Sequence, residues 1–305
     1  MFKRLATGIV YVLFLLAFFV ARVLLRDYFF HPLVFDGVIV LFSIIGTFEM
    51  CRAFGEKLDR VQKTVIQIFA TGVIVCYAVS DILYKYERQT DLTVVNYSPN
   101  FAFVVYMAGA AVLVSLLVFR HEKTSMESLG YSFLAYTYPS VFLLVLSGVN
   151  HMPAFSEIGL LFVFVICPFA DCFAFVFGMT LRKFLPMKMA PHVSPNKTLI
   201  GGFGGLWGGA IGAVCLFFIY FGLIQTAEFY FKWTNLVFFI ALGVLTAAFA
   251  ELGDLVESAI KRKLGIKDMG RLLPGHGGIL DRIDSSLFAA LIVCFVLVMR
   301  IMITG

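Results

Sequence analysis

The sequence predicts an all-α, polytopic integral membrane protein with about nine transmembrane helices and a cytoplasmic N-terminus. Of the 305 residues, 61% are hydrophobic and only 14% are charged, whereas roughly a quarter of the residues of a soluble domain are charged. Apolar runs long enough to cross a bilayer follow one another along the chain. The basic residues fall mainly on alternate connections between these runs.

Nine apolar runs are the candidate spans. The first follows Met1-Phe2-Lys3-Arg4 and is too long for the apolar part of a signal peptide, so we interpret it as a retained helix. In chain order, the spans lie near 6–25, 30–50, 64–84, 101–119, 132–150, 157–178, 201–224, 233–253 and 283–303.

The distribution of Lys and Arg supports this count. With the N-terminus inside, 18 of the 24 basic residues lie on cytoplasmic segments and 6 lie outside, as the positive-inside rule requires. The same topology puts the loops 179–200 and 254–282 on one side. The net charge of +5 suits anionic lipid headgroups, and basic residues spread over many short loops argue against a nucleic-acid partner.

Three acidic residues in the first half fall in or near the ends of apolar runs: Asp36, Glu49 and Asp81. An ionisable group at mid-bilayer costs about 2.5–3.5 kcal/mol, so each is open to a functional role. We favour positions that reach a membrane interface.

The stretch from Glu251 to Asp284 concentrates charge, with 12 of the chain's 43 Asp, Glu, Lys and Arg residues. If the preceding helix continues through Lys263 and ends at Gly265, four polar residues share one face at i, i+3, i+4 and i+7. These residues are Asp254, Glu257, Ser258 and Lys261.

A second helix is expected to start near Asp281, with Asp284 and Ser285 on the same face. Two acidic clusters joined by a basic, Gly-rich loop suit a divalent cation and a polyphosphate. The backbone N–H groups of Gly277 and Gly278, at the start of this helix, offer a further anion site. The alternative interpretation is a solvated charged loop between two spans.

This stretch resembles the signature of the CDP-diacylglycerol synthase family, the phosphatidate cytidylyltransferases. The resemblance depends on three ordered motifs. They read Ser258-x-x-Lys261-Arg262, then Lys267-Asp268-x-Gly270, then Pro274-x-His276-Gly277-Gly278-x-x-Asp281-Arg282-x-Asp284.

An upstream segment is similar to a second element of that family, in which an Asp leads through a Gly to a Ser-Pro-Lys-Lys-Thr-x-Glu-Gly run. The matching residues are Asp171, Gly178, Ser194, Pro195, Lys197, Thr198 and Gly201. Asn196 replaces the first Lys of the run, Ile200 stands where Glu is usual, and Lys183 follows Arg182 where Gly-Lys is common. These departures leave the lipid preference open.

The resemblance implies CTP-dependent cytidylyl transfer to phosphatidate, giving CDP-diacylglycerol and pyrophosphate. It implies catalytic roles for Asp254, Asp281, Lys261 and Asp284, and metal ligation by Asp254, Asp281, Asp284 and Asp171. The residues expected to bind substrate are Ser194, Lys197, Ser258, Arg262, Lys267, His276, Gly277, Gly278 and Arg282.

The implied cofactor is Mg²⁺, with a second cation as an alternative. The expected partners are CTP, phosphatidate and other membrane lipids, and a homodimer is an open alternative.

We expect one membrane domain over 1–305, with mainly structural helices in 1–150 and a catalytic half in 151–305 that includes both cytoplasmic loops. The short chain without appended domains indicates a multi-pass protein of the bacterial cytoplasmic membrane, with its active site facing the cytoplasm.

Three other functions stay open. The chain could transfer the cytidylyl group to another lipid phosphate, as Asn196 and Ile200 allow. It could be a transporter in which Asp171 and Glu251 couple an ion to a solute. A non-catalytic scaffold is hard to reconcile with an intact charged signature.

Two glycine series interrupt the apolar run that follows the upstream element. Gly201, Gly205 and Gly209 are spaced by four, as are Gly204, Gly208 and Gly212. The Walker pattern of phosphate loops is absent, so we interpret both series as close helix packing.

Overall fold

The computed structural model describes residues 2–89, 91, 93–153, 155–181, 183, 187–223, 232–273 and 277–304. Within these residues the chain is helical apart from one small hairpin. It divides into two compact units. Unit 1 comprises Met1–His151 and Ile266–Arg282, and unit 2 comprises Met152–Gly265 and Ile283–Gly305.

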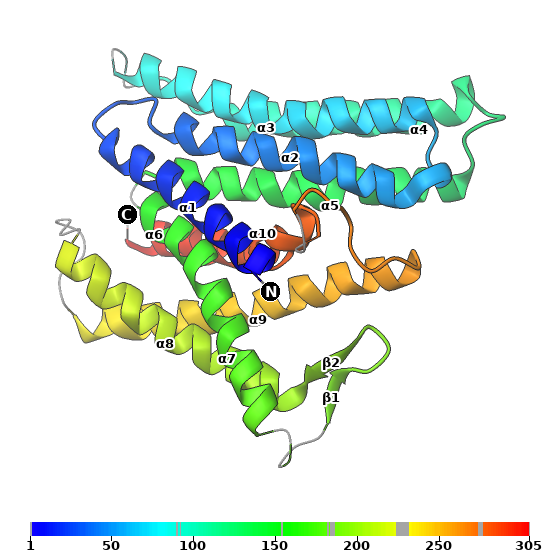
Figure 1. Ribbon diagram of the computed structural model, residues 1–305. Coiled ribbons are helices and arrows are strands. Elements are labelled where there is room, and N and C mark those ends of the chain that lie inside the picture. Colours follow the sequence, from blue (N-terminus) through cyan, green and yellow to red (C-terminus); the bar gives the residue numbers. More distant parts are fainter. Residues whose placement is uncertain are drawn as a thin grey trace. The chain divides into compact units, whose positions relative to one another are not determined.

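Unit 1 is built from five helices and the loop that carries most of the signature. The helices are α1 (Phe2–Leu24), α2 (Pro32–Phe54), α3 (Arg60–Arg88), α4 (Ser98–Phe119) and α5 (Met126–His151). A 3₁₀ turn (Gly55–Lys57) links α2 to α3, and α2, α3, α4 and α5 pack side by side (Figure 1). The start of α3 is fixed by a capping box, in which Asp59 and Gln62 each accept the other's backbone N–H at 2.8 Å.

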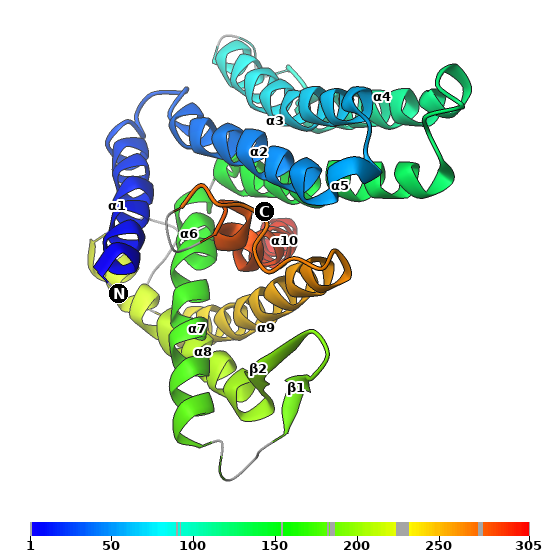
Figure 2. The same ribbon diagram turned by 45° about the vertical axis from the view of Figure 1, so that its right-hand side comes forward.

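Unit 2 holds the remaining helices. A short α6 (Ser156–Leu161), a π-helical turn (Phe162–Ile166) and α7 (Cys167–Thr180) run on as one apolar helix. The others are α8 (Leu199–Leu223), α9 (Trp233–Lys263) and α10 (Leu280–Thr304), whose first three residues group with unit 1. Between α7 and α8, β1 (Lys188–Ala190) and β2 (Ser194–Thr198) form an antiparallel hairpin, seen beside α8 in Figure 2.

The glycine series of α8 allow its close approach to two neighbours. A Cβ on Gly208 would meet the carbonyl oxygen of Phe169 in α7 at 2.7 Å, and one on Gly209 would meet that of Gly243 in α9 at 2.5 Å. Real Cβ atoms do not come this close to a carbonyl oxygen, so only glycine fits. The packing interpretation of the glycine series is therefore confirmed.

The prediction of an all-α, polytopic membrane protein is also confirmed. Among the described residues, eight helices are long and apolar enough to cross a membrane, and Val12–Leu24 of α1 is a shorter apolar helix. One detail differs from the sequence prediction. The hairpin of β1 and β2 lies in the segment 179–200, which the sequence predicts to be a loop. Helix α9 continues ten residues beyond the membrane span at 233–253, to Lys263, as the spacing of its polar residues predicts.

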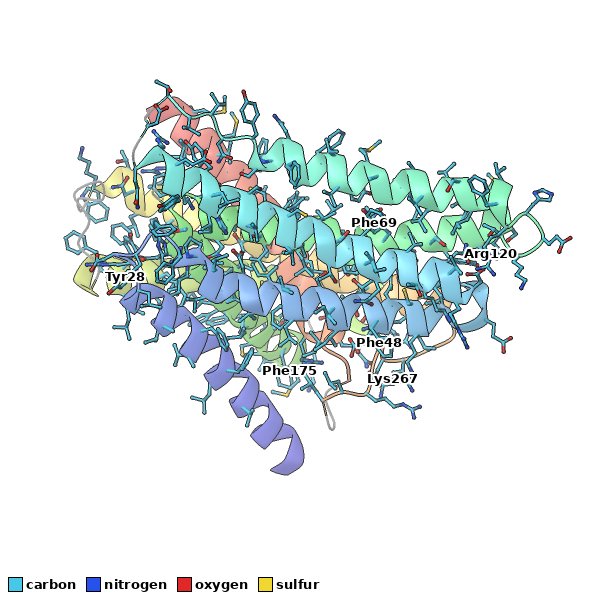
Figure 3. The ribbon with its side chains drawn as sticks, turned by 90° about the horizontal axis from the view of Figure 1, so that it is seen from above. Tyr28, Phe48, Phe69, Arg120, Phe175 and Lys267 are labelled. Atoms are coloured by element: carbon cyan, nitrogen blue, oxygen red, sulfur yellow. The ribbon has the colours of Figure 1, made fainter. Side chains whose placement is uncertain are left out.

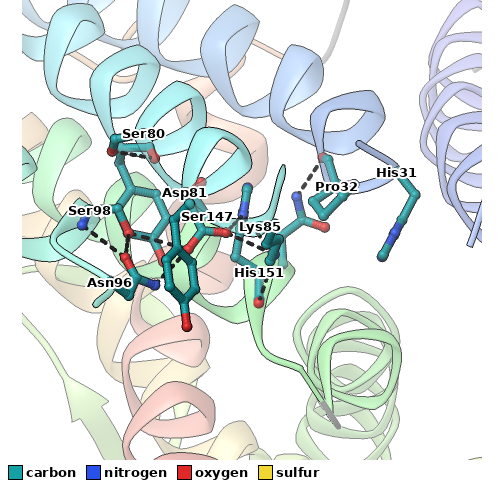
Figure 4. A network of polar contacts seen from close by, with 12 residues as sticks. His31, Pro32, Ser80, Asp81, Lys85, Asn96, Ser98, Ser147 and His151 are labelled. Atoms are coloured by element: carbon teal, nitrogen blue, oxygen red, sulfur yellow. Dashed lines mark hydrogen bonds and ion pairs between the residues drawn. The ribbon is translucent and has the colours of Figure 1, made fainter. Parts of the chain in front are cut away.

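A buried polar cluster joins the helices of unit 1 (Figure 4). The His151 ring lies between Asp36 and Asp81, with one ring nitrogen 2.5 Å from each carboxylate. If both carboxylates are ionised, both ring nitrogens must carry a proton. Lys85 lies 2.8 Å from Asp81. Asp36 and Asp81 are thus paired inside the protein, and their position near a membrane interface stays a prediction.

Around this centre, further polar groups extend the cluster to α1 and α4. Asn150 donates to Asp36 at 3.1 Å and accepts from Arg22 at 2.7 Å. Asn96, two residues before α4, and Ser98, the first residue of α4, donate to Asp81 at 3.0 and 3.2 Å. The cluster therefore links α1, α2, α3, α4 and α5 through buried charge.

We predict that His151→Asn destabilises the protein by about 3–5 kcal/mol, because two buried carboxylates lose their shared partner. The midpoint of thermal unfolding in detergent micelles measures this loss. His121→Asn is the matched control, since the His121 side chain is exposed. An unchanged midpoint for His151→Asn would show that the cluster adds no stability.

Candidate functional site

The acidic face at the end of α9 forms as the sequence predicts. The helix continues to Lys263, and Gly265 follows it with φ +68°, a left-handed conformation that glycine adopts without strain. The residues Asp254, Glu257, Ser258 and Lys261 therefore lie on a continuous helix.

The carboxylate of Asp281, at the start of α10, holds the signature loop in place. It accepts the backbone N–H groups of Met269 at 2.9 Å, Gly270 at 3.4 Å and Gly278 at 2.8 Å. Gly277 has φ +84° and leaves no room for a side chain, because a Cβ there would lie 2.8 Å from the Asp281 carboxylate. Asp281 thus has a folding role beside the metal ligation predicted for it.

Glu49 of α2 completes this arrangement. It is 4% exposed and accepts the backbone N–H groups of Ile279 at 3.1 Å and Leu280 at 2.9 Å. The glycines at 270 and 278 pack directly against its carboxylate, where any side chain would collide. A negative charge at a helix N-terminus is stabilised by the exposed N–H groups and the helix dipole.

The N-terminus of α10 therefore does bind anions, as expected from its glycines, but these anions are Glu49 and Asp281 of the protein itself. Binding of substrate phosphate by Gly277 and Gly278 stays a prediction. Glu49 was not among the predicted site residues, since its position in an apolar span carries no motif. Its signal was an acidic residue within a membrane span.

Unit 2 contains a cavity of about 510 Å³ between α7, β2, α8 and α9. Two carboxylates, Asp171 and Glu251, line it together with Lys197. Lys197 forms an ion pair of 2.5 Å with Asp254. The structure thus brings Asp171 and Lys197 of the upstream element close to Glu251 and Asp254 of α9.

Glu251 lies against the glycine face of α8. A Cβ on Gly202 would approach one oxygen of its carboxylate to 3.1 Å, and one on Gly205 would overlap the other. This second oxygen, Oε1, is buried and accepts no hydrogen bond from the residues that the structure describes. Buried polar atoms normally have a partner, so this oxygen is suited to a bound cation or proton.

Next to the cavity, the acids of α9 and α10 are paired. Lys261 lies 2.9 Å from Glu257, which is fully buried. Asp284 is hydrogen-bonded to Glu257, an arrangement of two carboxyl groups that needs a proton or a cation. Ser258 donates to Asp254 at 3.3 Å.

The remaining predicted residues occupy varied positions. Ser194 is half-buried in β2, and Arg262 donates to the Val193 carbonyl at 3.3 Å, which ties α9 to the hairpin. Lys267 and Arg282 are exposed, while His276 lies outside the described residues. Asp281, Lys267, Gly277, Gly278 and Arg282 belong to unit 1, and the other described site residues belong to unit 2. That both sets act in one site stays a prediction.

The residues fit a magnesium ion that arrives with a polyphosphate. In the part of the chain that the structure describes, no three His, Cys, Asp or Glu side chains form a ready metal site. Mg²⁺, however, is usually bound by one or two carboxylates together with substrate phosphates and water. The hard oxygen donors and the unsatisfied oxygen of Glu251 suit this mode.

Comparison with known proteins identifies the family. Residues 3–300 match the cytidylyltransferase family, which is nearly the whole chain. The chain belongs to the cytidylyltransferase family. The motifs around Asp281 and Lys197 are therefore those of a nucleotidyl-transferring family, and the resemblance stated from the sequence is confirmed.

Several curated relatives are named phosphatidate cytidylyltransferase. One from Staphylococcus haemolyticus is 34% identical over 186 residues, which cover 60% of this chain and 64% of that protein. One from Staphylococcus aureus is 43% identical over 131 residues, or 42% and 45% of the two chains. One from Staphylococcus epidermidis is 39% identical over 129 residues, with the same coverage. The chain thus matches about half to two thirds of the length of these relatives.

We predict that Glu49→Leu loosens the signature loop, because two backbone N–H groups at the start of α10 lose a buried acceptor at about 1–3 kcal/mol each. Amide hydrogen exchange of residues 269–282 should rise by roughly tenfold or more. Glu49→Gln keeps an acceptor oxygen and should have a smaller effect. Glu56→Gln, at an exposed glutamate, should have none. Unchanged protection in Glu49→Leu would contradict the positioning role.

Proposed function

We propose that the protein transfers the cytidylyl group of CTP to phosphatidate, giving CDP-diacylglycerol and pyrophosphate. The match to the cytidylyltransferase family over residues 3–300 carries this proposal. The relatives named phosphatidate cytidylyltransferase support phosphatidate as the acceptor. Their bacterial sources and the apolar helices support a place in a bacterial cytoplasmic membrane. The distribution of Lys and Arg, with 18 of 24 on the predicted cytoplasmic segments, supports an active site on the cytoplasmic side.

In the proposed reaction, a phosphate oxygen of phosphatidate attacks the α-phosphorus of CTP. A new P–O bond forms, the bond from the α-phosphorus to the bridging oxygen breaks, and pyrophosphate leaves with the electron pair. The lipid phosphate is already anionic at neutral pH, so the reaction needs no strong base. Its main barrier is repulsion between two anions, which positioning and positive charge overcome.

The lysines of unit 2 are suited to this task. Lys197 is held by Asp254 and Lys261 by Glu257, so both ammonium groups are positioned before a phosphate binds. Arg262 is held by a carbonyl oxygen of the hairpin. Preorganised cations stabilise developing negative charge more strongly than mobile ones, because they need not reorganise during the reaction.

Mg²⁺ would supply charge neutralisation for the triphosphate. The candidate ligands are Asp171, Asp254, Asp284 and Asp281, with a second cation as an alternative, and the buried oxygen of Glu251 adds a fifth candidate. The carboxylates would hold the ion, while the lysines and arginines would bind the remaining phosphate oxygens.

A second candidate is cytidylyl transfer to a different lipid phosphate. Asn196, which departs from the family pattern, lines the cavity of unit 2. Because its side chain is a neutral amide, the cavity has one cationic side chain fewer than it would have with the usual Lys.

An ion-coupled transporter is a further alternative, because Asp171 and Glu251 line the same cavity. Transport would need a gradient and would consume no CTP.

A turnover assay distinguishes these functions. Purified protein in detergent–lipid micelles receives labelled CTP, Mg²⁺ and phosphatidate, and label in the lipid phase and released pyrophosphate are measured. We expect labelled CDP-lipid in equal amount to pyrophosphate, and loss of both on chelation of the metal. CTP binding without transfer would favour another lipid phosphate. Absence of CTP binding would contradict the proposal.

We predict that Asp281→Asn lowers turnover by at least about a hundredfold while the protein stays membrane-inserted. The neutral amide can still accept one of the loop N–H bonds but lacks the charge for a cation. Asp27→Asn, at an exposed aspartate, is the matched control and should be as active as the wild type. Full activity of Asp281→Asn would exclude metal ligation by this residue.

A further inference from the structure

A groove between the end of α2 and the start of α3 carries three cationic side chains: Arg52, Arg60 and Lys63. Its volume is about 580 Å³. Lys63 donates to the Gly55 carbonyl at 2.6 Å, but none of the three has a carboxylate partner among the described residues. The neighbouring Asp59 pairs with Arg120 instead, at 3.3 Å. The groove therefore holds three cations without a direct ion pair, and the carboxylate of Glu49 interacts with the charge of Arg52 from farther away.

The side chains that line the groove change from cationic at one end to apolar at the other. The cations lie where α2 ends and α3 begins, Thr64 and Gln67 follow, and Phe48 and Ile68 form an apolar end. Phe48 is 59% exposed and Ile68 is 62% exposed. From Arg60 to Ile68 the helix rises roughly 12 Å. Figure 3 labels Phe48 on α2 and Phe69, the neighbour of Ile68, on α3.

We propose that this groove binds the phosphate headgroup of an anionic phospholipid, with an acyl chain along Phe48 and Ile68. Basic pockets between membrane helices bind such headgroups, and Arg and Lys form strong, charge-assisted hydrogen bonds to phosphate. Free phosphate shares the headgroup chemistry but cannot use the apolar end. The combination of cations at a helix end and exposed apolar residues further along the span fits a lipid.

Arg52 also lines a second hollow of about 230 Å³, formed with the signature loop by Ile266 and residues 268–271. Both hollows lie within unit 1. A phosphate on Arg52 would therefore lie beside the loop that Asp281 and Glu49 hold in place. The inference does not rest on the proposed reaction, because lipid binding at the groove needs no CTP.

The test is lipid binding by the full, delipidated chain, measured by native mass spectrometry in detergent. Phosphatidylglycerol is the probe, because it is anionic and carries no phosphate monoester. Phosphatidylcholine is the zwitterionic comparison. We expect the anionic lipid to bind more tightly, and Arg60→Gln/Lys63→Gln to weaken it by roughly fivefold for each cation removed. Lys123→Gln removes an exposed charge outside the groove and should not change binding.

A photoreactive acyl chain on the same lipid gives the location. We expect crosslinks within residues 48–68, and Thr64→Trp, which fills the groove without removing charge, should reduce them. Thermal unfolding checks that each variant is folded. If Arg60→Gln/Lys63→Gln does not fold, the crosslinking result for Thr64→Trp alone tests the proposal. Equal binding of both lipids, full affinity in the double variant, or crosslinks elsewhere would overturn the proposal. Displacement of the lipid by inorganic phosphate would assign the groove to free phosphate instead.

Discussion

A carboxylate buried among apolar helices must find a hydrogen-bond donor or a cation, and this requirement organises the protein. Glu49 meets it with the backbone N–H groups that open α10, and Asp36 and Asp81 meet it through His151. In unit 2, the buried Glu257 meets it with Lys261 of the same helix, and the half-buried Asp254 pairs with Lys197 of β2. Because leaving such a group without a partner costs several kcal/mol, those contacts that join different segments fix which segments pack together.

The sequence was sufficient for the features that depend on pattern. Apolar runs predicted the helices, the i, i+3, i+4 spacing predicted the continuation of α9 through Lys263, and the glycine spacing predicted the packing of α8. The motifs around Asp281 and Lys197 predicted the family. These features are local or periodic, so one stretch of sequence contains their whole signal.

Other features depend on contacts between distant residues, which a single sequence does not reveal. Glu49 and the N–H of Ile279 are separated by 230 positions, and no spacing rule joins them. The hairpin of β1 and β2 was missed because its strands are short and the second contains Pro195, a residue that disfavours strands. The folding role of Asp281 was missed because its motif also suits metal ligation.

The length of α9 has a mechanical consequence. Its 31 residues span roughly 46 Å at 1.5 Å per residue, whereas the hydrocarbon core of a bilayer is about 30 Å thick. The helix is therefore longer than the hydrocarbon core is thick, and its C-terminal part, which bears Asp254, Glu257 and Lys261, extends the membrane span as one continuous helix. In a continuous helix, the position of a residue along the sequence sets the direction of its side chain. Inserting one residue before Asp254 in α9 would rotate these three side chains by about 100° about the helix axis, away from their present partners.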